Sequence, residues 1–262
     1  MTYRLAVVGG GNMGAALVGG LLHAGWAASD LAIVEVLPAR VAELGELFPG
    51  VAVTPTVPAC SAALIAVKPY DVATACAAAA HAGATRLLSI AAGISLATLQ
   101  DAAGPDVTVV RAMPNTPALV GKGAAAICGG ASADDADLAW AESILGAVGI
   151  VVRVPETQLD AVTGLAGSGP AYLFLVAEAL IDAGVLAGLS RANAVDLVTQ
   201  LMVGSAVLLA ERGDPAALRA MVTSPGGTTA AGLRALEEAA VRSAFLEAVM
   251  AATARSRELG AH

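Results

Sequence analysis

The first part of the chain alternates short apolar runs with segments of helical length. Five runs are apolar at nearly every position: residues 5–8, 31–34, 63–67, 87–90 and 107–110. Continuous apolar runs of this length are typical of strands buried on both faces of a parallel sheet. Segments of helical length lie between them, at residues 13–23, 38–47 and 70–80. The pattern predicts a doubly wound α/β domain.

Beyond residue 110 the pattern changes in two steps. Two further strands are predicted at residues 124–128 and 148–152, with a helix between them that begins near residues 132–134, where Ser132 and Asp134 can act as caps. After Val154 the chain becomes rich in Ala, Leu and Gly, with long helical stretches separated by Gly- and Pro-containing breaks. We therefore predict an α/β domain at residues 1–154 and an all-α domain at residues 155–262.

The two helices predicted between Ser168 and Ala210 are apolar almost all round. Only Glu178, Asp182, Arg191 and Asp196 carry charge in this stretch. Such helices must be buried on most sides, and a small helical domain cannot cover them alone. A second copy of the same domain would cover them, so we expect an obligate homodimer or a multiple of dimers.

Composition and charge exclude several classes of protein. Hydrophobic residues make up 57% and charged residues 14% of the chain, which excludes intrinsic disorder. Fourteen Lys and Arg face 22 Asp and Glu, so a nucleic-acid partner is not expected. The three cysteines, at positions 60, 76 and 128, have no Cys-x-x-Cys spacing. We expect no bound metal, no disulfide framework and a cytoplasmic location.

Residues 5–29 contain no Asp, Glu, Lys or Arg, and a hydropathy scan alone could assign them to a membrane. Glycines interrupt the middle of this stretch, where a spanning helix needs apolar side chains. The other apolar stretches, at 161–177 and 197–210, are broken by glycine and proline or too short. The sequence therefore predicts a soluble protein without a membrane partner.

The same glycines form a nucleotide-binding pattern, Gly9-x-Gly11-x-x-Gly14, between a predicted strand and a predicted helix. Gly9 would permit a tight turn, Gly11 would let a pyrophosphate approach the backbone, and Gly14 would allow close packing of helix on strand. Glu35 ends the second strand, where a carboxylate accepts hydrogen bonds from the adenosine ribose and repels a 2′-phosphate. The pattern predicts a Rossmann-type domain that binds NAD(P)H, with NADH favoured by Glu35. Arg40 is the one nearby cation that could reverse this preference. The alternative for the glycines is a glycine-rich turn that binds nothing, and the alternative for Glu35 is a solvated strand end.

Five segments of the chain carry a family resemblance. They are Gly9 to Gly14, Ala66-Val67-Lys68-Pro69, residues 111–117 (Arg-Ala-Met-Pro-Asn-Thr-Pro), residues 164–172 and residues 222–229. In this order they resemble the motifs of pyrroline-5-carboxylate reductases over essentially the whole chain. The resemblance implies reduction of 1-pyrroline-5-carboxylate to L-proline by a nicotinamide cofactor, and a helical domain through which subunits dimerise. Many members of the family prefer NADPH, and Glu35 sets this chain apart.

The cofactor is expected at the carboxyl ends of the parallel strands, where three loops of small or rigid residues emerge. With the glycine turn and the resemblance, these loops give a predicted cofactor-binding set: Gly9, Gly11, Asn12, Met13, Gly14, Glu35, Ala66, Val67, Lys68, Pro69, Ala91, Gly93 and Asn115. For the prolines, loop stiffening is an equally good explanation. Lys68 could equally be a solvated cation.

The segment from Ser224 to Thr229 precedes a helical run and offers bare backbone N–H groups to an anion. We expect the substrate carboxylate to bind there, at Ser224, Gly226, Gly227, Thr228 and Thr229. Thr229 is the predicted catalytic residue, with its hydroxyl near the imine nitrogen. Simple helix capping by Ser or Thr is the alternative.

The sequence offers no convincing general acid, since His23, His81 and His262 lie on helices or at the terminus. An imine can arrive already protonated, so positioning against the hydride donor can suffice. Two other functions remain open. A β-hydroxyacid dehydrogenase usually has a Lys on the helix between domains, but no Lys follows Lys122. A noncatalytic dinucleotide sensor would have no need of the Ser-Pro-Gly-Gly turn.

Overall fold

A computed structural model describes residues 2–260 and divides the chain into two compact units. The first unit holds the chain up to Ser168 and again from Met250 onward, and the second holds Gly169–Val249.

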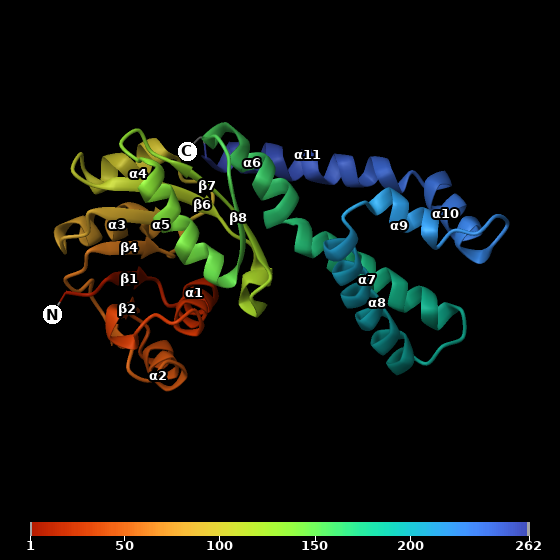
Figure 1. The fold of residues 1–262 in the computed structure, drawn as a ribbon, viewed down its shortest axis with the longest axis horizontal. Helices are drawn as coiled ribbons and strands as arrows, with labels where there is room; N and C mark the ends of the chain where they lie inside the picture. The colour runs from red at the N-terminus through yellow and green to blue at the C-terminus, as the bar shows by residue number, and fades with distance from the viewer. Residues whose placement is uncertain (1, 261–262) are drawn as a thin grey trace. The chain divides into compact units, whose positions relative to one another are not determined.

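The first unit is built on one eight-stranded sheet with the order β3-β2-β1-β4-β5-β6-β7-β8 (Figure 1). The strands are β1 (Leu5–Val8), β2 (Leu31–Val34), β3 (Ala52–Thr54), β4 (Ala62–Ile65), β5 (Arg86–Ser89), β6 (Thr108–Met113), β7 (Gly123–Gly129) and β8 (Gly149–Arg153). Neighbouring strands are parallel except for β7, which runs antiparallel to β6. The Rossmann-type doubly wound sheet is therefore confirmed, and the five strands predicted to be parallel are parallel. The connection at residues 114–122 is too short for a crossover helix, so the chain turns back beside β6.

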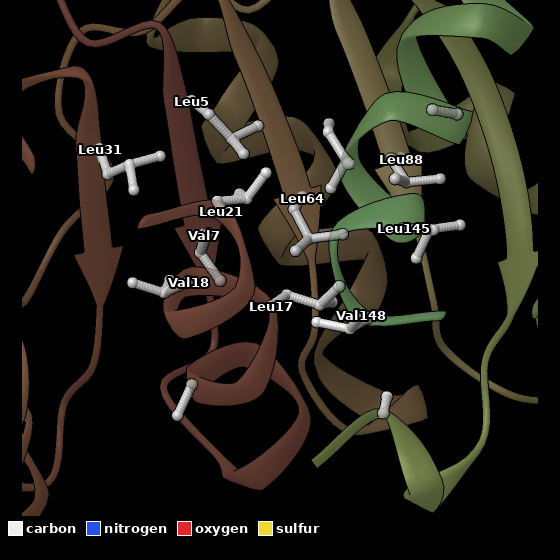
Figure 2. Close-up of a cluster of buried hydrophobic side chains, with 14 of the residues drawn as sticks. Leu5, Val7, Leu17, Val18, Leu21, Leu31, Leu64, Leu88, Leu145 and Val148 are labelled. Atoms are coloured by element: carbon white, nitrogen blue, oxygen red, sulfur yellow. The ribbon is translucent and has the colours of Figure 1, made fainter. Parts of the chain in front are cut away.

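Helices cover both faces of this sheet. They are α1 (Asn12–His23), α2 (Pro38–Leu47), α3 (Val72–His81), α4 (Leu96–Ala103), α5 (Asp135–Leu145) and the short α6 (Leu159–Val162). One face is packed by α1, α2 and α5, through a core that includes Leu17, Leu44 and Ile144. Figure 2 shows part of this core, with Leu5, Val7, Leu64 and Leu88 of the strands facing α1 and α5. The other face is packed by α3 and α4.

Short one-turn helices link these elements: η1 (Ala28–Asp30), η2 (Pro69–Asp71), η3 (Thr116–Val120), η4 (Gly146–Val148), η5 (Glu156–Gln158) and the π-helical η6 (Thr163–Gly167). The helix predicted at residues 70–80 is thus divided into η2 and α3. The predicted cap of α5 is confirmed, because the Asp134 carboxylate accepts from the N–H groups of Ala136 and Asp137. The sequence analysis missed β3, which has only three residues.

The second unit is helical and consists of α7 (Gly169–Leu186), α8 (Arg191–Arg212), α9 (Pro215–Met221), α10 (Thr228–Glu238) and the beginning of α11 (Val241–Gly260). Its boundaries differ from the division predicted after Val154, for two physical reasons. Leu159 of α6 is buried with Ala126 and Cys128 of β7, which keeps this segment in the first unit. The end of α11 also belongs to the first unit, where the Ser256 hydroxyl donates to Asp160 at 2.6 Å.

The helices α7 and α8 pack on one another as a hairpin but leave apolar side chains exposed. Gly184 of α7 allows this packing, since a Cβ there would lie 3.3 Å from the Ala194 Cβ of α8. Phe174, Leu175 and Leu201 are each more than half exposed in the single chain. By length and composition alone, two helical stretches could cross a membrane, Glu156–Leu186 and Arg191–Arg212. The second is longer than the stretch considered in the sequence analysis, because the helix continues beyond its apolar centre.

Candidate functional site

A cleft of about 970 Å³ opens in the first unit where β1, β2 and β4 end. Three parallel strands deliver their carboxyl-end loops to it, as the doubly wound topology requires. Of the predicted cofactor-binding residues, eight line this cleft: Gly9, Gly11, Asn12, Met13, Glu35, Ala66, Val67 and Lys68. Eight residues named from the sequence therefore lie together in one cleft.

The geometry of the glycine turn explains why side chains are missing there. Gly9 has φ of +111°, and a Cβ at this position would lie 2.6 Å from the Ala66 carbonyl oxygen. At Gly14 a Cβ would collide with the Gly9 carbonyl oxygen, which indicates that this glycine allows α1 to pack closely behind the turn. A Cβ on Gly11 would instead point into open space.

Gly11 is also the residue that caps α1. No side chain satisfies the first N–H groups of this helix, whose amino end lies at the cleft. Exposed amide groups and the helix dipole together attract a phosphate. The residues present therefore fit the pyrophosphate of a dinucleotide.

Glu35 lies at the cleft with one carboxylate oxygen already engaged. Its Oε1 accepts from the N–H groups of Val36 and Leu37 at 2.8 and 3.0 Å. Oε2 accepts no hydrogen bond from residues 2–260 and would lie 3.1 Å from a Cβ on Gly10. This oxygen can accept from a sugar hydroxyl beside the glycine turn.

Arg40 lies next to the turn, but its guanidinium is engaged. Its Nε donates to the Gly10 carbonyl at 2.8 Å, and its NH1 pairs with Glu43 at 2.7 Å. Arg40 thus stabilises the glycine turn through its hydrogen bond to Gly10. A 2′-phosphate would have to compete with Glu43 for the Arg40 guanidinium.

The structure adds cleft residues that the sequence analysis missed. Most come from the loop after β3 and from η2 and α3: Pro55, Thr56, Val57, Tyr70, Asp71, Thr74, Ala75 and Ala78. Tyr70 is 82% exposed, although it is a large aromatic residue. That exposure becomes visible only in the structure, because in the sequence Tyr70 begins an ordinary helical run.

Five predicted residues do not line the cleft: Gly14, Pro69, Ala91, Gly93 and Asn115. Ala91 is buried in the core behind β5, and Gly93 lies against the last turn of α11, near Leu259. Asn115 is 9% exposed, and its side chain is bonded to backbone groups at both ends. Its amide donates to the Ala166 carbonyl and accepts from the Ala124 N–H.

In the second unit, the segment from Ser224 to Thr229 forms the amino end of α10. The N-cap is Gly227, and no side chain caps the helix, so the capping role considered for Ser or Thr is not found. Gly226 has φ of +67°, and a Cβ on Gly227 would collide with the Ser224 hydroxyl. The turn therefore presents backbone N–H groups and the hydroxyl-bearing residues Ser224, Thr228 and Thr229 within one short segment.

Other reactive groups lie away from these two places. His23 and His81 are at the carboxyl ends of α1 and α3, and His262 lies outside the described residues. Burial raises the pKa of the Cys76 and Cys128 thiols to about 11, so both are protonated at neutral pH. Among residues 2–260 no three His, Cys, Asp or Glu side chains gather as a metal site.

Two known protein families match separate parts of the chain. Residues 4–93, which contain the glycine turn and Glu35, match the family described as NADP oxidoreductase, coenzyme F420-dependent. Residues 156–259 match the family described as pyrroline-5-carboxylate reductase dimerisation.

Relatives of known name and structure match nearly the whole chain. A pyrroline-5-carboxylate reductase of Mycobacterium tuberculosis is 44% identical, with 98% of this chain and 96% of the relative covered. A structure of a pyrroline-5-carboxylate reductase from Coxiella burnetii has a TM-score of 0.91, 32% identity and 99% coverage of both chains. A Plasmodium falciparum pyrroline carboxylate reductase with NADP bound has a TM-score of 0.85, 30% identity and 98% coverage of both. The chain belongs to the pyrroline-5-carboxylate reductase family.

Proposed function

We propose that the chain reduces 1-pyrroline-5-carboxylate to L-proline with a hydride from NAD(P)H, the last step of proline biosynthesis. The observation that carries the proposal is the glycine turn at the amino end of α1, in a cleft wide enough for a dinucleotide. Membership of the reductase family supports the choice of substrate. A β-hydroxyacid dehydrogenase and a noncatalytic sensor are the competing functions.

For the cofactor, we propose that the cleft binds NADH at least as well as NADPH. The nicotinamide supplies the hydride, and the protein supplies the binding groups. The Glu35 carboxylate lies where an adenosine ribose would bind, and it would repel a 2′-phosphate. Arg40, which could neutralise that phosphate, is paired with Glu43. The NADP bound to the Plasmodium relative argues for the broader NAD(P)H assignment.

For the substrate, we propose that the uncapped amino end of α10 binds the carboxylate. Backbone N–H groups at a helix end favour an anion, and the Ser224 and Thr228 hydroxyls can add hydrogen bonds. A ring imine that arrives protonated is already electrophilic at carbon. Positioning that carbon against the hydride donor then supplies most of the rate enhancement. The Thr229 hydroxyl lies beside the ring nitrogen in this arrangement.

We also propose that residues 1–154 serve dinucleotide binding, and residues 155–262 serve substrate binding and dimerisation. The dimerisation family model at residues 156–259 supports this functional division. A second copy would cover the exposed apolar side chains of α7 and α8. Three free, buried cysteines and a net charge of −8 favour a cytoplasmic enzyme without nucleic-acid or membrane partners.

One assay tests the proposal directly. Oxidation of NADH and of NADPH should be followed by absorbance with and without 1-pyrroline-5-carboxylate, and the product identified as proline. We expect oxidation only when the imine is present. Binding of NADH without any turnover would favour the sensor, and reduction of NAD+ by a 3-hydroxy acid, with no reaction of the imine, would favour the dehydrogenase.

Replacing Thr229 with Ala tests the proposed role of its hydroxyl. We expect kcat/KM for the imine to fall about tenfold to a hundredfold, since a hydrogen bond to a charged partner is lost. The dissociation constant for NADH, measured by fluorescence, should stay within about threefold of wild type. Full activity in Thr229→Ala would mean that the hydroxyl does not bind the imine nitrogen in the reaction.

A further inference from the structure

Asn115 was predicted to bind the cofactor, but both polar atoms of its side chain are hydrogen-bonded to backbone groups of the protein. It follows Pro114, which lines the cleft, at the end of β6. Its Oδ1 accepts from the Ala124 N–H at 2.8 Å, and its Nδ2 donates to the Ala166 carbonyl at 3.0 Å. One backbone partner is a donor and the other an acceptor, so the side chain must both accept and donate, which an amide can do and a carboxylate cannot.

The carbonyl of Ala166 needs this external donor because of the sequence that follows it. In an α-helix it would accept from the N–H four residues later, but that residue is Pro170, which has none. The chain forms the π-helix Thr163–Gly167 here instead, with the Ser168 N–H bonded to the Thr163 carbonyl at 2.8 Å. The Asn115 amide supplies the missing hydrogen bond.

A glycine brings this π-helix close to the end of β6. A Cβ on Gly167 would lie only 2.8 Å from the Met113 Cε, so the end of the Met113 side chain lies directly against this glycine. Met113, Pro114 and Asn115 are consecutive residues. The π-helix therefore contacts the residue before and the residue after Pro114, which lines the cleft. Single π-helical turns occur often at functional sites.

We propose that Asn115 is a positioning residue for hydride transfer. By joining the π-helix to β7, its amide fixes the loop that presents Pro114 to the cleft, without itself binding the cofactor. The inference rests on the proposed binding of the dinucleotide in this cleft. It replaces the direct cofactor contact predicted for Asn115 from the sequence.

Asn115→Asp tests this role, because it keeps the acceptor for Ala124 and removes the donor to Ala166. The matched control is Gln100→Glu, the same chemical change in the same unit. The Gln100 amide donates to the Gly104 and Val107 carbonyls at 2.7 and 3.0 Å, before β6 begins and away from the cleft. For each variant, kcat, the NADH dissociation constant, the melting temperature and the kinetic isotope effect with deuterated NADH should be measured at pH 8.

We expect Asn115→Asp to lower kcat about tenfold or more, since a shift of about 1 Å in the reacting groups can cost on the order of a hundredfold. The isotope effect should rise as hydride transfer becomes slower, while the NADH dissociation constant stays within about threefold of wild type. Gln100→Glu should lower the melting temperature but leave kcat within about twofold. If Asn115→Asp does not fold, Asn115→Ala, which removes both hydrogen bonds without adding a charge, should show the same pattern.

Two results would overturn the inference. If kcat is within about twofold of wild type in the folded variant, the amide is only structural. If the NADH dissociation constant rises by the same factor by which kcat/KM for NADH falls, Asn115 binds the cofactor directly. Failure of the proposed function would show separately, as wild-type protein that neither binds NADH nor reduces the imine.

Discussion

A single carboxylate directly after β2, that of Glu35, is the residue on which the proposed cofactor preference depends. Glu35 lies in the cleft with one oxygen held by two backbone N–H groups, which fixes the direction of the other. A rigid carboxylate discriminates between a ribose hydroxyl and a phosphate more sharply than a mobile one, because it cannot swing away from the unwanted charge.

Replacing Glu35 with Ser should therefore shift the enzyme toward NADPH. We expect the ratio of kcat/KM for NADPH to that for NADH to rise about tenfold or more, which corresponds to roughly 1.4 kcal/mol. The control is Glu46→Gln, which removes the same charge from an exposed position on α2. A native enzyme that already prefers NADPH by about tenfold would contradict this interpretation of Glu35.

At the residue scale, the sequence was informative where backbone geometry demands a residue type. Gly9 and Gly14 were assigned roles that the positive φ and the close contacts bear out. The partners of the Asn115 amide could not be predicted, because Ala124 and Ala166 offer only backbone groups, which are the same at every position. The cleft positions of Tyr70 and Thr74 likewise depend on how η2 and α3 turn beside β4.

At the scale of elements, the amino end of α10 combines two glycines with different functions. Gly226 permits a left-handed turn, whereas Gly227 leaves room for the Ser224 hydroxyl. The shape of this turn, and not only its hydroxyl groups, should therefore be needed for substrate binding.

Gly227→Ala tests the importance of that shape. The added Cβ would collide with the Ser224 hydroxyl, so we expect KM for the imine to rise about tenfold or more, as expected when an ordered polar contact is lost. Gly45→Ala is the control, since Gly45 is exposed on α2 and a Cβ there meets open space. It should stabilise the protein by up to about 1 kcal/mol without changing KM. An unchanged KM in Gly227→Ala would remove the turn from the substrate site.

The elements themselves were predicted well where apolar runs are long. The bounds of β1, β2 and α2 agree with the sequence analysis, since burial on both faces leaves a continuous apolar run and Pro38 marks a helix start. The direction of β7 was not predictable from hydropathy, because a strand shows the same pattern in either direction. Pairing with β6 follows from the short connection before it.

At the scale of the whole molecule, the exposed apolar helices connect folding with association. Covering the exposed apolar side chains of α7 and α8 would lower the free energy by about 25 cal/mol for each Å² of apolar surface removed from water. A partner that covers them therefore stabilises the folded chain as well as the complex.

Light scattering over a dilution series should show a dimer or a multiple of dimers, and no stable monomer. The melting temperature should also rise with protein concentration, as expected when unfolding and dissociation are coupled. A folded, active monomer at micromolar concentration would contradict this prediction. Recovery of the protein only with the membrane fraction would instead mean that lipid covers Glu156–Leu186 and Arg191–Arg212.

The return of α11 to the first unit has a consequence for how the chain folds as it is made. The Ser256–Asp160 hydrogen bond and the contact of Gly260 with the Gly93 carbonyl need residues that leave the ribosome after all the other helices. The nucleotide-binding unit therefore cannot be completed until α11 has emerged. During that interval the apolar helices α7 and α8 have already emerged, and their exposed side chains favour aggregation until a partner covers them.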